Sequence, residues 1–170
     1  MRLPQLKKNN EKMNSLEIKN ILSHDRVTKK YFLDVFPSDQ LPVRIVHYPA
    51  CFVCNVDSST ESGSHWLAFF LSSPDEGEFF DSYGNVPRYF KGPISEFASR
   101  YSRMNYNPLI LQSSITAVCG QYCVYYLYSR CRGQTLQKIL SNFVTKNVCN
   151  DRLVYNFVAK RFGVYVNFYQ

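Results

Sequence analysis

This chain of 170 residues has the length of one ordinary domain, which can bury a substantial core without disulfides or metals. It is 45% hydrophobic and 16% aromatic, and no apolar run approaches the roughly 20 residues of a membrane-spanning helix, which excludes such a span. The net charge of +7 permits a polyanionic partner such as DNA, but the basic residues are too dispersed to form a nucleic-acid-binding tail. Because the N-terminus lacks a secretory signal, we expect an intracellular, reduced protein with free cysteines.

The beginning of the chain divides into a tail and the start of a domain. The first residues are polar and basic, and we expect them to be flexible. Asn14 is followed three residues later by Glu17, which is the pattern of a capping box. This pattern predicts a helix that ends near Ser23. We therefore expect a flexible basic segment at 1–13 and a single domain at 14–170.

Strand-forming residues gather in short runs between turn signals. The run 65–71 is apolar almost throughout, which is typical of a central strand that is buried on both faces. Pro74 and Gly77 predict a turn after it, so that 78–81 returns as the second strand of a hairpin. Shorter runs predict further strands at 43–46, 50–56 and 109–112.

Helical patterns dominate the second half of the chain. Pro93 suits a first helical turn, and apolar residues follow at helical spacing up to Tyr101. The segment 119–130 contains no proline and is apolar almost all round, which indicates a buried helix. Two further helices are predicted at about 136–143 and 151–162. Because the helices flank a central block of strands, the expected fold class is α+β.

Cys119 is the strongest candidate for a nucleophile, because it stands where a loop becomes the buried helix. Backbone N–H groups at the start of a helix stabilise a thiolate and lower the pKa of a cysteine. Gly120 leaves room for a substrate to approach. The simpler alternative is an inert core cysteine, which is the commoner role of a single cysteine. Cys123, one helical turn further along, is expected to be a packing residue.

A base and its orienting group are provided by the predicted hairpin. His65 begins the central strand, which could project a base from the sheet edge, whereas His24 and His47 have no rigid strand to hold them. Asp81 ends the partner strand, so its carboxylate could accept the ring N–H of His65 and fix the tautomer. The alternative role of Asp81 is to cap the turn at 82–84.

Gln112 ends the strand predicted at 109–112 and lies a short loop upstream of Cys119. Its side-chain amide could donate a hydrogen bond to the oxygen that becomes negative when a thiolate attacks a carbonyl group. The backbone N–H of Cys119 would be the second donor. A glutamine at a strand end is usually polar surface, so this role depends on the other members of the set.

The order of these residues resembles the adenovirus protease (adenain) family of cysteine peptidases. The pattern runs from a His-Trp pair through an acidic residue after aromatics, and through a glutamine, to Ser-x-x-Ala-x-Cys-Gly. The seven-residue step from Gln112 to Cys119 matches the adenoviral enzymes, whereas Asp81-Ser82 is more similar to Ulp/SENP-type peptidases, which process SUMO-like proteins. Similar proteases occur in Polinton/Maverick-type transposons. The resemblance covers about residues 15–145 and is carried by the segments 63–69, 79–84 and 112–123.

The resemblance implies an α+β fold with a mixed central sheet and with the nucleophile at the start of a buried central helix. It implies a cysteine endopeptidase in which Cys119 attacks the peptide carbonyl, and His65 takes up and returns the proton. In the same scheme Asp81 orients His65, Gln112 stabilises the oxyanion, and Trp66 packs near the catalytic helix. Such enzymes often cleave after small residues, commonly glycine, and the implied role is maturation of viral or transposon structural proteins.

The resemblance also bears on partners. It implies a polypeptide substrate and a monomer in the host nucleus or the virion, with no cofactor, metal or membrane required. Adenoviral enzymes are activated by DNA and by a viral peptide that is bound through a disulfide. This chain has no cysteine between Asp81 and Cys119, where the family places the partner cysteine. Activation by DNA or by a peptide is therefore an analogy only.

Three alternatives stay open. Cys51 and Cys54 invite a zinc site, but no second ligand pair stands at suitable spacing, and residues three apart on a strand face opposite sides. An isopeptidase or processing protease for a ubiquitin- or SUMO-like modifier would use the same chemistry on a different substrate. An inactive relative that serves as a binding module is the third, and against it no catalytic position has been replaced.

Overall fold

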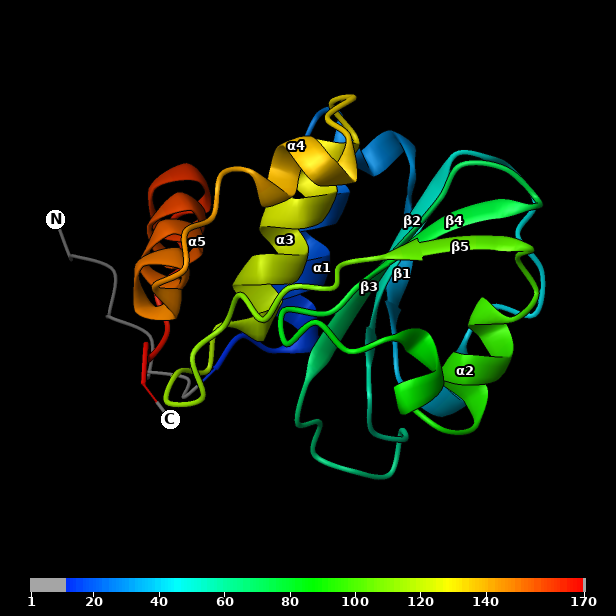
Figure 1. The fold of residues 1–170 in the computed structure, drawn as a ribbon, viewed down its shortest axis with the longest axis horizontal. Helices are drawn as coiled ribbons and strands as arrows, with labels where there is room; N and C mark the ends of the chain where they lie inside the picture. The colour runs from blue at the N-terminus through cyan, green and yellow to red at the C-terminus, as the bar shows by residue number, and fades with distance from the viewer. Residues whose placement is uncertain (1–11, 170) are drawn as a thin grey trace, which may run out of the picture.

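The computed structural model describes residues 12–169. Within these residues, five strands form one mixed sheet in the order β1-β2-β3-β4-β5 (Figure 1). The inner pairs β2/β3 and β3/β4 are antiparallel, and the outer pairs β1/β2 and β4/β5 are parallel. The expected α+β fold with a mixed sheet is confirmed. The strands are β1 (Phe32–Phe36), β2 (Ala50–Asn55), β3 (Trp66–Leu71), β4 (Glu76–Phe80) and β5 (Arg103–Tyr106).

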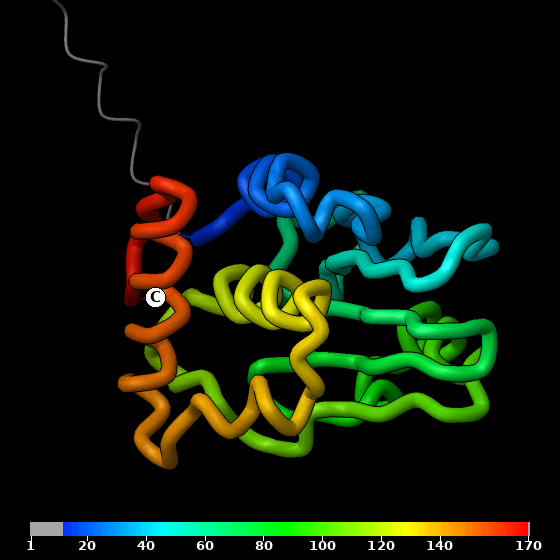
Figure 2. Tube along the Cα trace, turned by 90° about the horizontal axis from the view of Figure 1, so that it is seen from above, coloured from blue at the N-terminus to red at the C-terminus, as the bar shows by residue number. Residues whose placement is uncertain are grey.

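Helices cover both faces of this sheet. The α-helices are α1 (Ser15–His24), α2 (Pro93–Ala98), α3 (Cys119–Arg130), α4 (Leu136–Leu140) and α5 (Asn147–Phe162). Short 3-10 helices lie in the connections: η1 (Thr28–Lys30), η2 (Ser38–Gln40) and η3 (Pro87–Tyr89). Helices α1 and α3 pack on one face and α2 on the other, and the view from above shows α3 between the sheet and α5 (Figure 2). None of the helices in the described part combines the length and apolar character that crossing a membrane requires.

The core has two parts because the central strands are buried on both faces. Every residue of β2 and β3 is buried, which confirms the prediction for the apolar run 65–71. Alternate residues enter the two halves of the core: Phe70 faces α3, and Phe69 faces α2. Helix α3 is itself central, since Tyr122 and Tyr126 are fully buried. The ring of Tyr126 stacks on Phe80 with centroids 4.6 Å apart, which fixes α3 against β4.

The predicted capping box forms at the start of α1. The Asn14 side chain accepts from the backbone N–H of Glu17 at 2.9 Å, and the Glu17 carboxylate accepts from the backbone N–H of Asn14 at 3.0 Å. Met13, which the sequence places in the flexible segment, is 1% exposed, and its carbonyl accepts from Trp66 Nε1 at 3.0 Å. The packed domain thus includes Met13, while residues 1–11 of the predicted segment lie outside the described residues.

Two predicted strands are wrong. The segment 43–46 is a loop in which Val43 is 91% exposed and Val46 is 69% exposed, whereas Ile45 packs against the core. The segment 109–112 is also a loop. The Asn107 side chain closes a turn there by accepting from the backbone N–H of Leu109 at 2.9 Å and donating to its carbonyl at 2.9 Å. The strand in this region is β5, just before Pro108.

Helix boundaries differ from prediction by a few residues. Helix α2 ends at Ala98 rather than near Tyr101, and α4 ends at Leu140 rather than near residue 143. Helix α5 begins at Asn147, before the predicted start at Asp151. Because apolar residues beyond a helix end can still pack into the core, helical spacing alone overestimates its length.

Candidate active site

The β3–β4 hairpin brings His65 and Asp81 together. Because the two strands are antiparallel and pair Ala68 with Phe80, the residue before β3 and the residue after β4 lie at the same end of the sheet. His65 Nε2 and Asp81 Oδ1 are 2.7 Å apart. The Asp81 side chain is fully buried and that of His65 is 13% exposed, so water competes little for this contact.

Besides the contact with His65, Asp81 accepts hydrogen bonds from groups of the loop that follows β4. Its Oδ1 also accepts from the backbone N–H of Tyr83 at 3.0 Å, and its Oδ2 accepts from the backbone N–H and the Nδ2 of Asn85 at 3.2 and 2.7 Å. Burial alone would raise the pKa of Asp81, but the hydrogen bond and charge of His65, with these donors, hold it below its ordinary value. The turn-capping role and the His65 contact thus occur in the same side chain.

Cys119 is the first residue of α3, and its thiol meets the other side of the His65 ring. Burial would raise the pKa of Cys119, but the hydrogen bond and charge of His65, and the backbone N–H groups of Trp66 and Gly120, lower it. Burial likewise opposes charging of His65, yet its contacts with Asp81 and Cys119 raise the pKa of His65 to about 9. The two shifts favour the thiolate–imidazolium form of the pair over the neutral form. Since Nε2 faces Asp81, Nδ1 is the ring atom that serves the thiol.

The Gln112 side chain is fixed in one orientation. It is 2% exposed, and its Oε1 accepts from Ser82 Oγ at 2.8 Å while its Nε2 donates to the carbonyl of Thr116 at 2.9 Å. The amide nitrogen carries two hydrogens, so one serves Thr116 and the other can serve a ligand in the adjoining cavity. The N–H of Cys119 is a second donor, because the first N–H groups of a helix have no acceptor within the helix.

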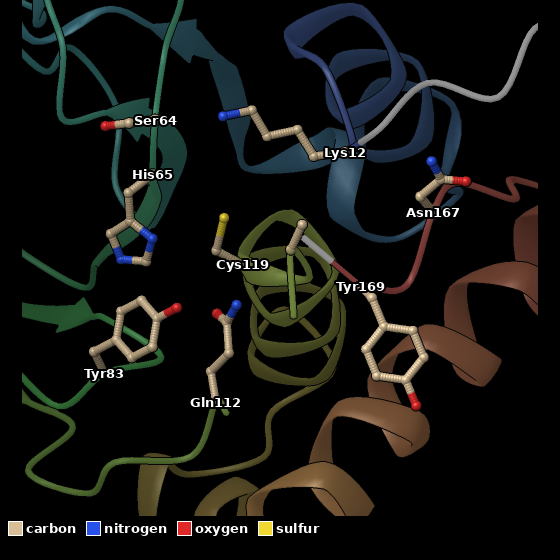
Figure 3. Close-up of a pocket in the computed structure, with 9 residues that line it drawn as sticks. Lys12, Ser64, His65, Tyr83, Gln112, Cys119, Asn167 and Tyr169 are labelled. Carbon is tan, nitrogen blue, oxygen red and sulfur yellow. The ribbon is translucent and has the colours of Figure 1, made fainter. Parts of the chain in front are cut away.

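A cavity of about 710 Å³ lies over these groups (Figure 3). Figure 3 shows His65 and Tyr83 on one side, Cys119 and Gln112 facing them, and Tyr169 on the opposite side. The rings of His65 and Tyr83 have centroids 5.1 Å apart. The cavity thus offers a nucleophile, a base and hydrogen-bond donors to one ligand. Its lining residues are Lys12, Ser64, His65, Tyr83, Gln112, Ala117, Cys119, Asn167 and Tyr169.

Sequence reasoning missed the contribution of the C-terminal segment. The backbone N–H of Ala117 donates to the carbonyl of Phe168 at 3.3 Å, and Thr116 and Tyr169 form an isolated β-bridge. The segment therefore lies beside the loop that leads to Cys119. No local motif marks it, because the contact is made by backbone groups that every residue carries.

The site also depends on two polar residues whose roles were not foreseen. Ser82 belongs to the Asp-Ser pair noted above, but its contact with Gln112 spans thirty residues of sequence. Asn85 donates twice to Asp81 and carries no recognisable signal in the sequence. Both roles arise only when the loops after β4 and before α3 are folded together.

The rival residues lie elsewhere. The ring of His24 lies 2.8 Å from the carbonyl of Asn20 at the end of α1, and His47 is exposed in a loop. Cys51 and Cys54 enter opposite halves of the core, as expected for residues three apart on a strand. The described residues contain no cluster of three or more His, Cys, Asp or Glu side chains that could hold a metal ion. Cys123 is buried in the core, as a packing residue should be.

No family model and no curated protein sequence matches the chain. Among solved structures, the ASFV pS273R protease is similar over 86% of this chain and 67% of its own, with 18% identity and a TM-score of 0.56. The central domain of the uncharacterised Lpg1148 protein from Legionella pneumophila is similar over 89% of this chain and 97% of its own, with 13% identity and a TM-score of 0.50. At these identities the likeness shows a shared fold, and one of the proteins with that fold is a protease.

Proposed function

We propose that this chain is a cysteine endopeptidase. The observation that carries the proposal is the chain of contacts from the buried Asp81 carboxylate through the His65 ring to the Cys119 thiol at the first residue of a helix. This arrangement lowers the pKa of the thiol and raises that of the ring, which is the condition for a nucleophilic thiolate beside a general acid. The fold shared with a protease supports the same activity.

The first half of the reaction forms an acyl-enzyme. The Cys119 thiolate attacks the carbonyl carbon of the peptide bond, and the carbonyl oxygen becomes negative. The Gln112 side-chain amide and the Cys119 N–H donate hydrogen bonds to that oxygen. As the C–N bond breaks, His65 gives its proton to the departing amine, and the acyl group stays on sulfur as a thioester. Asp81 keeps the ring oriented for this transfer.

The second half releases the product. His65, now neutral, accepts a proton from a water molecule whose oxygen attacks the thioester carbonyl. The same two donors stabilise the second oxyanion, and the C–S bond breaks to release a carboxylic acid. The thiolate and the imidazolium of His65 are then restored.

The substrate class follows from the resemblance to adenain-like enzymes. We infer cleavage after small residues such as glycine, in the maturation of viral or transposon structural proteins. In support, two large aromatic residues, Tyr83 and Tyr169, line the cavity that contains Cys119 and take up space there (Figure 3). A library of fluorogenic peptides that varies the residue before the cleaved bond tests this inference. Preference for a large side chain at that position would refute it.

A vinyl-sulfone probe tests the proposed chemistry without knowledge of the substrate. The probe should label Cys119 in the wild-type chain at neutral pH, and the label should be lost in Cys119→Ala and greatly slowed in His65→Ala. Replacement of the rival histidine, His47→Ala, is the matched control and should leave the labelling rate unchanged. Equal labelling of wild type and His65→Ala would show that His65 does not activate the thiol.

An isopeptidase that processes ubiquitin- or SUMO-like modifiers is the second candidate function. The observation that favours it is the Asp81-Ser82 pair, in which Ser82 Oγ donates to Gln112 Oε1 at 2.8 Å, because the pair resembles Ulp/SENP-type enzymes. A panel of small modifiers with Gly-Gly ends, compared with peptides from virus-like structural proteins, separates the two functions. Cleavage of a folded modifier at a rate far above that of the peptides would favour the isopeptidase.

A further inference from the structure

A second buried carboxylate, Asp151 of α5, lies next to the candidate active site but outside the Asp81–His65–Cys119 chain. Its side chain is fully buried. It accepts hydrogen bonds from the backbone N–H of Ser113 at 3.1 Å and from Thr116 Oγ1 at 2.9 Å, and its Oδ1 lies 2.9 Å from the Tyr122 hydroxyl. Burying a carboxyl group is costly unless its oxygens are hydrogen-bonded, so these three contacts are needed to keep it there.

Each partner of Asp151 adjoins a part of the proposed oxyanion site. Ser113 directly follows Gln112, and the carbonyl of Thr116 accepts the hydrogen bond from Gln112 Nε2. Tyr122 lies on α3, one turn after Cys119. The Asp151 side chain therefore connects two parts of the molecule. It contacts Ser113 and Thr116 in the loop after Gln112, and it contacts Tyr122 in the helix that begins with Cys119.

Neighbouring residues of α5 reinforce this attachment. Asn150 Nδ2 donates to the carbonyl of Leu111 at 3.3 Å, and Asn147 Nδ2 donates to the carbonyl of Gln112 at 3.3 Å. The Tyr122 hydroxyl lies 2.9 Å from both the Leu111 carbonyl and Asp151 Oδ1, although it has only one proton to donate. A proton on Asp151 would make both contacts hydrogen bonds, and burial, which outweighs the hydrogen bonds that oppose it, raises the pKa of Asp151.

We propose that Asp151 is a positioning residue that holds the Gln112 amide over the Cys119 thiol, so that the oxyanion site is preorganised. The inference rests on the proposed peptidase function. It assigns α5 a role in turnover although no side chain of that helix lines the cavity. In this role Asp151 acts through Gln112 and not through the thiolate–imidazolium pair.

Two reactions of Cys119 separate this role from a general structural one. Peptide hydrolysis passes through an oxyanion, whereas alkylation by iodoacetamide displaces iodide from a saturated carbon and forms none. The variant Asp151→Leu removes all hydrogen-bonding capacity at this position. Its kcat/KM should fall by at least about 10-fold. The fall should not exceed about 10²–10³-fold, which is the cost of losing an oxyanion donor outright. The fall should lie in kcat, while the alkylation rate and its pH profile stay those of the wild type.

The conservative variant Asp151→Asn should restore most of the activity. Its oxygen can accept from Ser113 and Thr116, while its amide group can donate to the Tyr122 hydroxyl, which then donates to the Leu111 carbonyl. Asp25→Asn is the matched control for loss of a buried carboxylate, since Asp25 pairs with Arg132 away from the cavity. It should lower the midpoint of thermal unfolding without changing kcat.

The outcomes are distinct. Unchanged hydrolysis in Asp151→Leu would overturn the proposal, as would a parallel loss of alkylation, which would place the effect on the thiol itself. If Asp151→Leu does not fold, Thr116→Val removes one of the three hydrogen-bonding partners of Asp151 and keeps the carbonyl that Gln112 needs. A selective loss of hydrolysis in that variant supports the proposal, and no loss overturns it. Failure of the wild-type chain to hydrolyse any peptide would refute the proposed function itself, before any variant is compared.

Discussion

Asp81→Asn is the most direct test of the proposed proton path. The change removes the negative charge next to His65 and one of the two oxygens that accept from His65, Tyr83 and Asn85. In the variant, the amide NH₂ group faces groups that donate hydrogen bonds to the carboxylate in the wild type. The loop after β4 therefore loses a hydrogen bond and its electrostatic attraction to the His65 ring.

The pKa of His65 determines how far the alkaline limit of activity should shift. Its rise from 6.5 to about 9 corresponds to about 3 kcal/mol in favour of the imidazolium, shared between Asp81 and Cys119. Removal of one opposite charge in contact should lower that pKa by about 1–2 pH units. The reaction needs the protonated ring as the acid for the leaving amine, so activity is lost as pH rises through the pKa of His65. Near neutral pH at least about half of the rings would still be protonated, so we expect kcat/KM to fall by about 10²–10⁴-fold mainly because the ring loses the partner that fixes its tautomer and orientation.

The assay is the pH dependence of kcat/KM with one fluorogenic peptide. The wild type should lose activity on the alkaline side near pH 9, and Asp81→Asn should lose it at a pH about 1–2 units lower. Asp75→Asn, an exposed carboxylate at the opposite end of the same hairpin, should match the wild type. An unchanged alkaline limb in Asp81→Asn, with only the thermal stability reduced, would show that Asp81 merely caps its turn.

Loss of the Gln112 amide in Gln112→Ala should lower kcat/KM by about 10²–10³-fold, with alkylation of the thiol unchanged; a matching loss of alkylation would contradict an oxyanion role. Cys119→Ala should abolish hydrolysis and keep the thermal unfolding transition, whereas Cys123→Ala should retain activity. Equal inactivity of the two cysteine variants would mean that the nucleophile is misassigned. Tyr169→Ala removes a wall of the cavity and should raise KM for peptides, while Tyr165→Ala, another exposed tyrosine of the same segment, should leave KM unchanged in steady-state kinetics.

Elements that bury a continuous apolar surface could be predicted from the sequence. Strand β3 is apolar throughout and both of its faces are covered, and most residues of α3 are buried because the helix lies between the sheet and α5. Both elements place a candidate residue at their beginning, so His65 and Cys119 could be identified from the same patterns. The capping box at Asn14 was predictable for a similar reason, since its two partners are three residues apart.

Elements that depend on pairing between backbone groups could not be predicted from the sequence. Strand β5 is a polar strand at the edge of the sheet, and backbone hydrogen bonds attach it to β4. Its mostly polar side chains do not show the alternation of apolar and polar residues by which a strand is recognised in a sequence. The segment 109–112 has the composition of a strand, yet its backbone is bonded to the carbonyl of Ser82 and to the Asn107 side chain. Composition indicates which side chains favour a strand, but it does not indicate whether the backbone of that segment pairs with another strand.

The amino-acid order by itself determined which residue types stand at the ends of rigid elements, and so which four side chains were candidates for chemistry. Only the tertiary structure decided that His65 turns Nε2 to Asp81 and that Ser82 orients the Gln112 amide. It also decided that Asp151 contacts both α3 and the loop between Gln112 and Cys119. The physical reason is the distance along the sequence over which each interaction acts. Periodicity and capping act over a few residues, whereas these hydrogen bonds join groups 16 to 35 residues apart, and only a folded chain brings them within 3 Å.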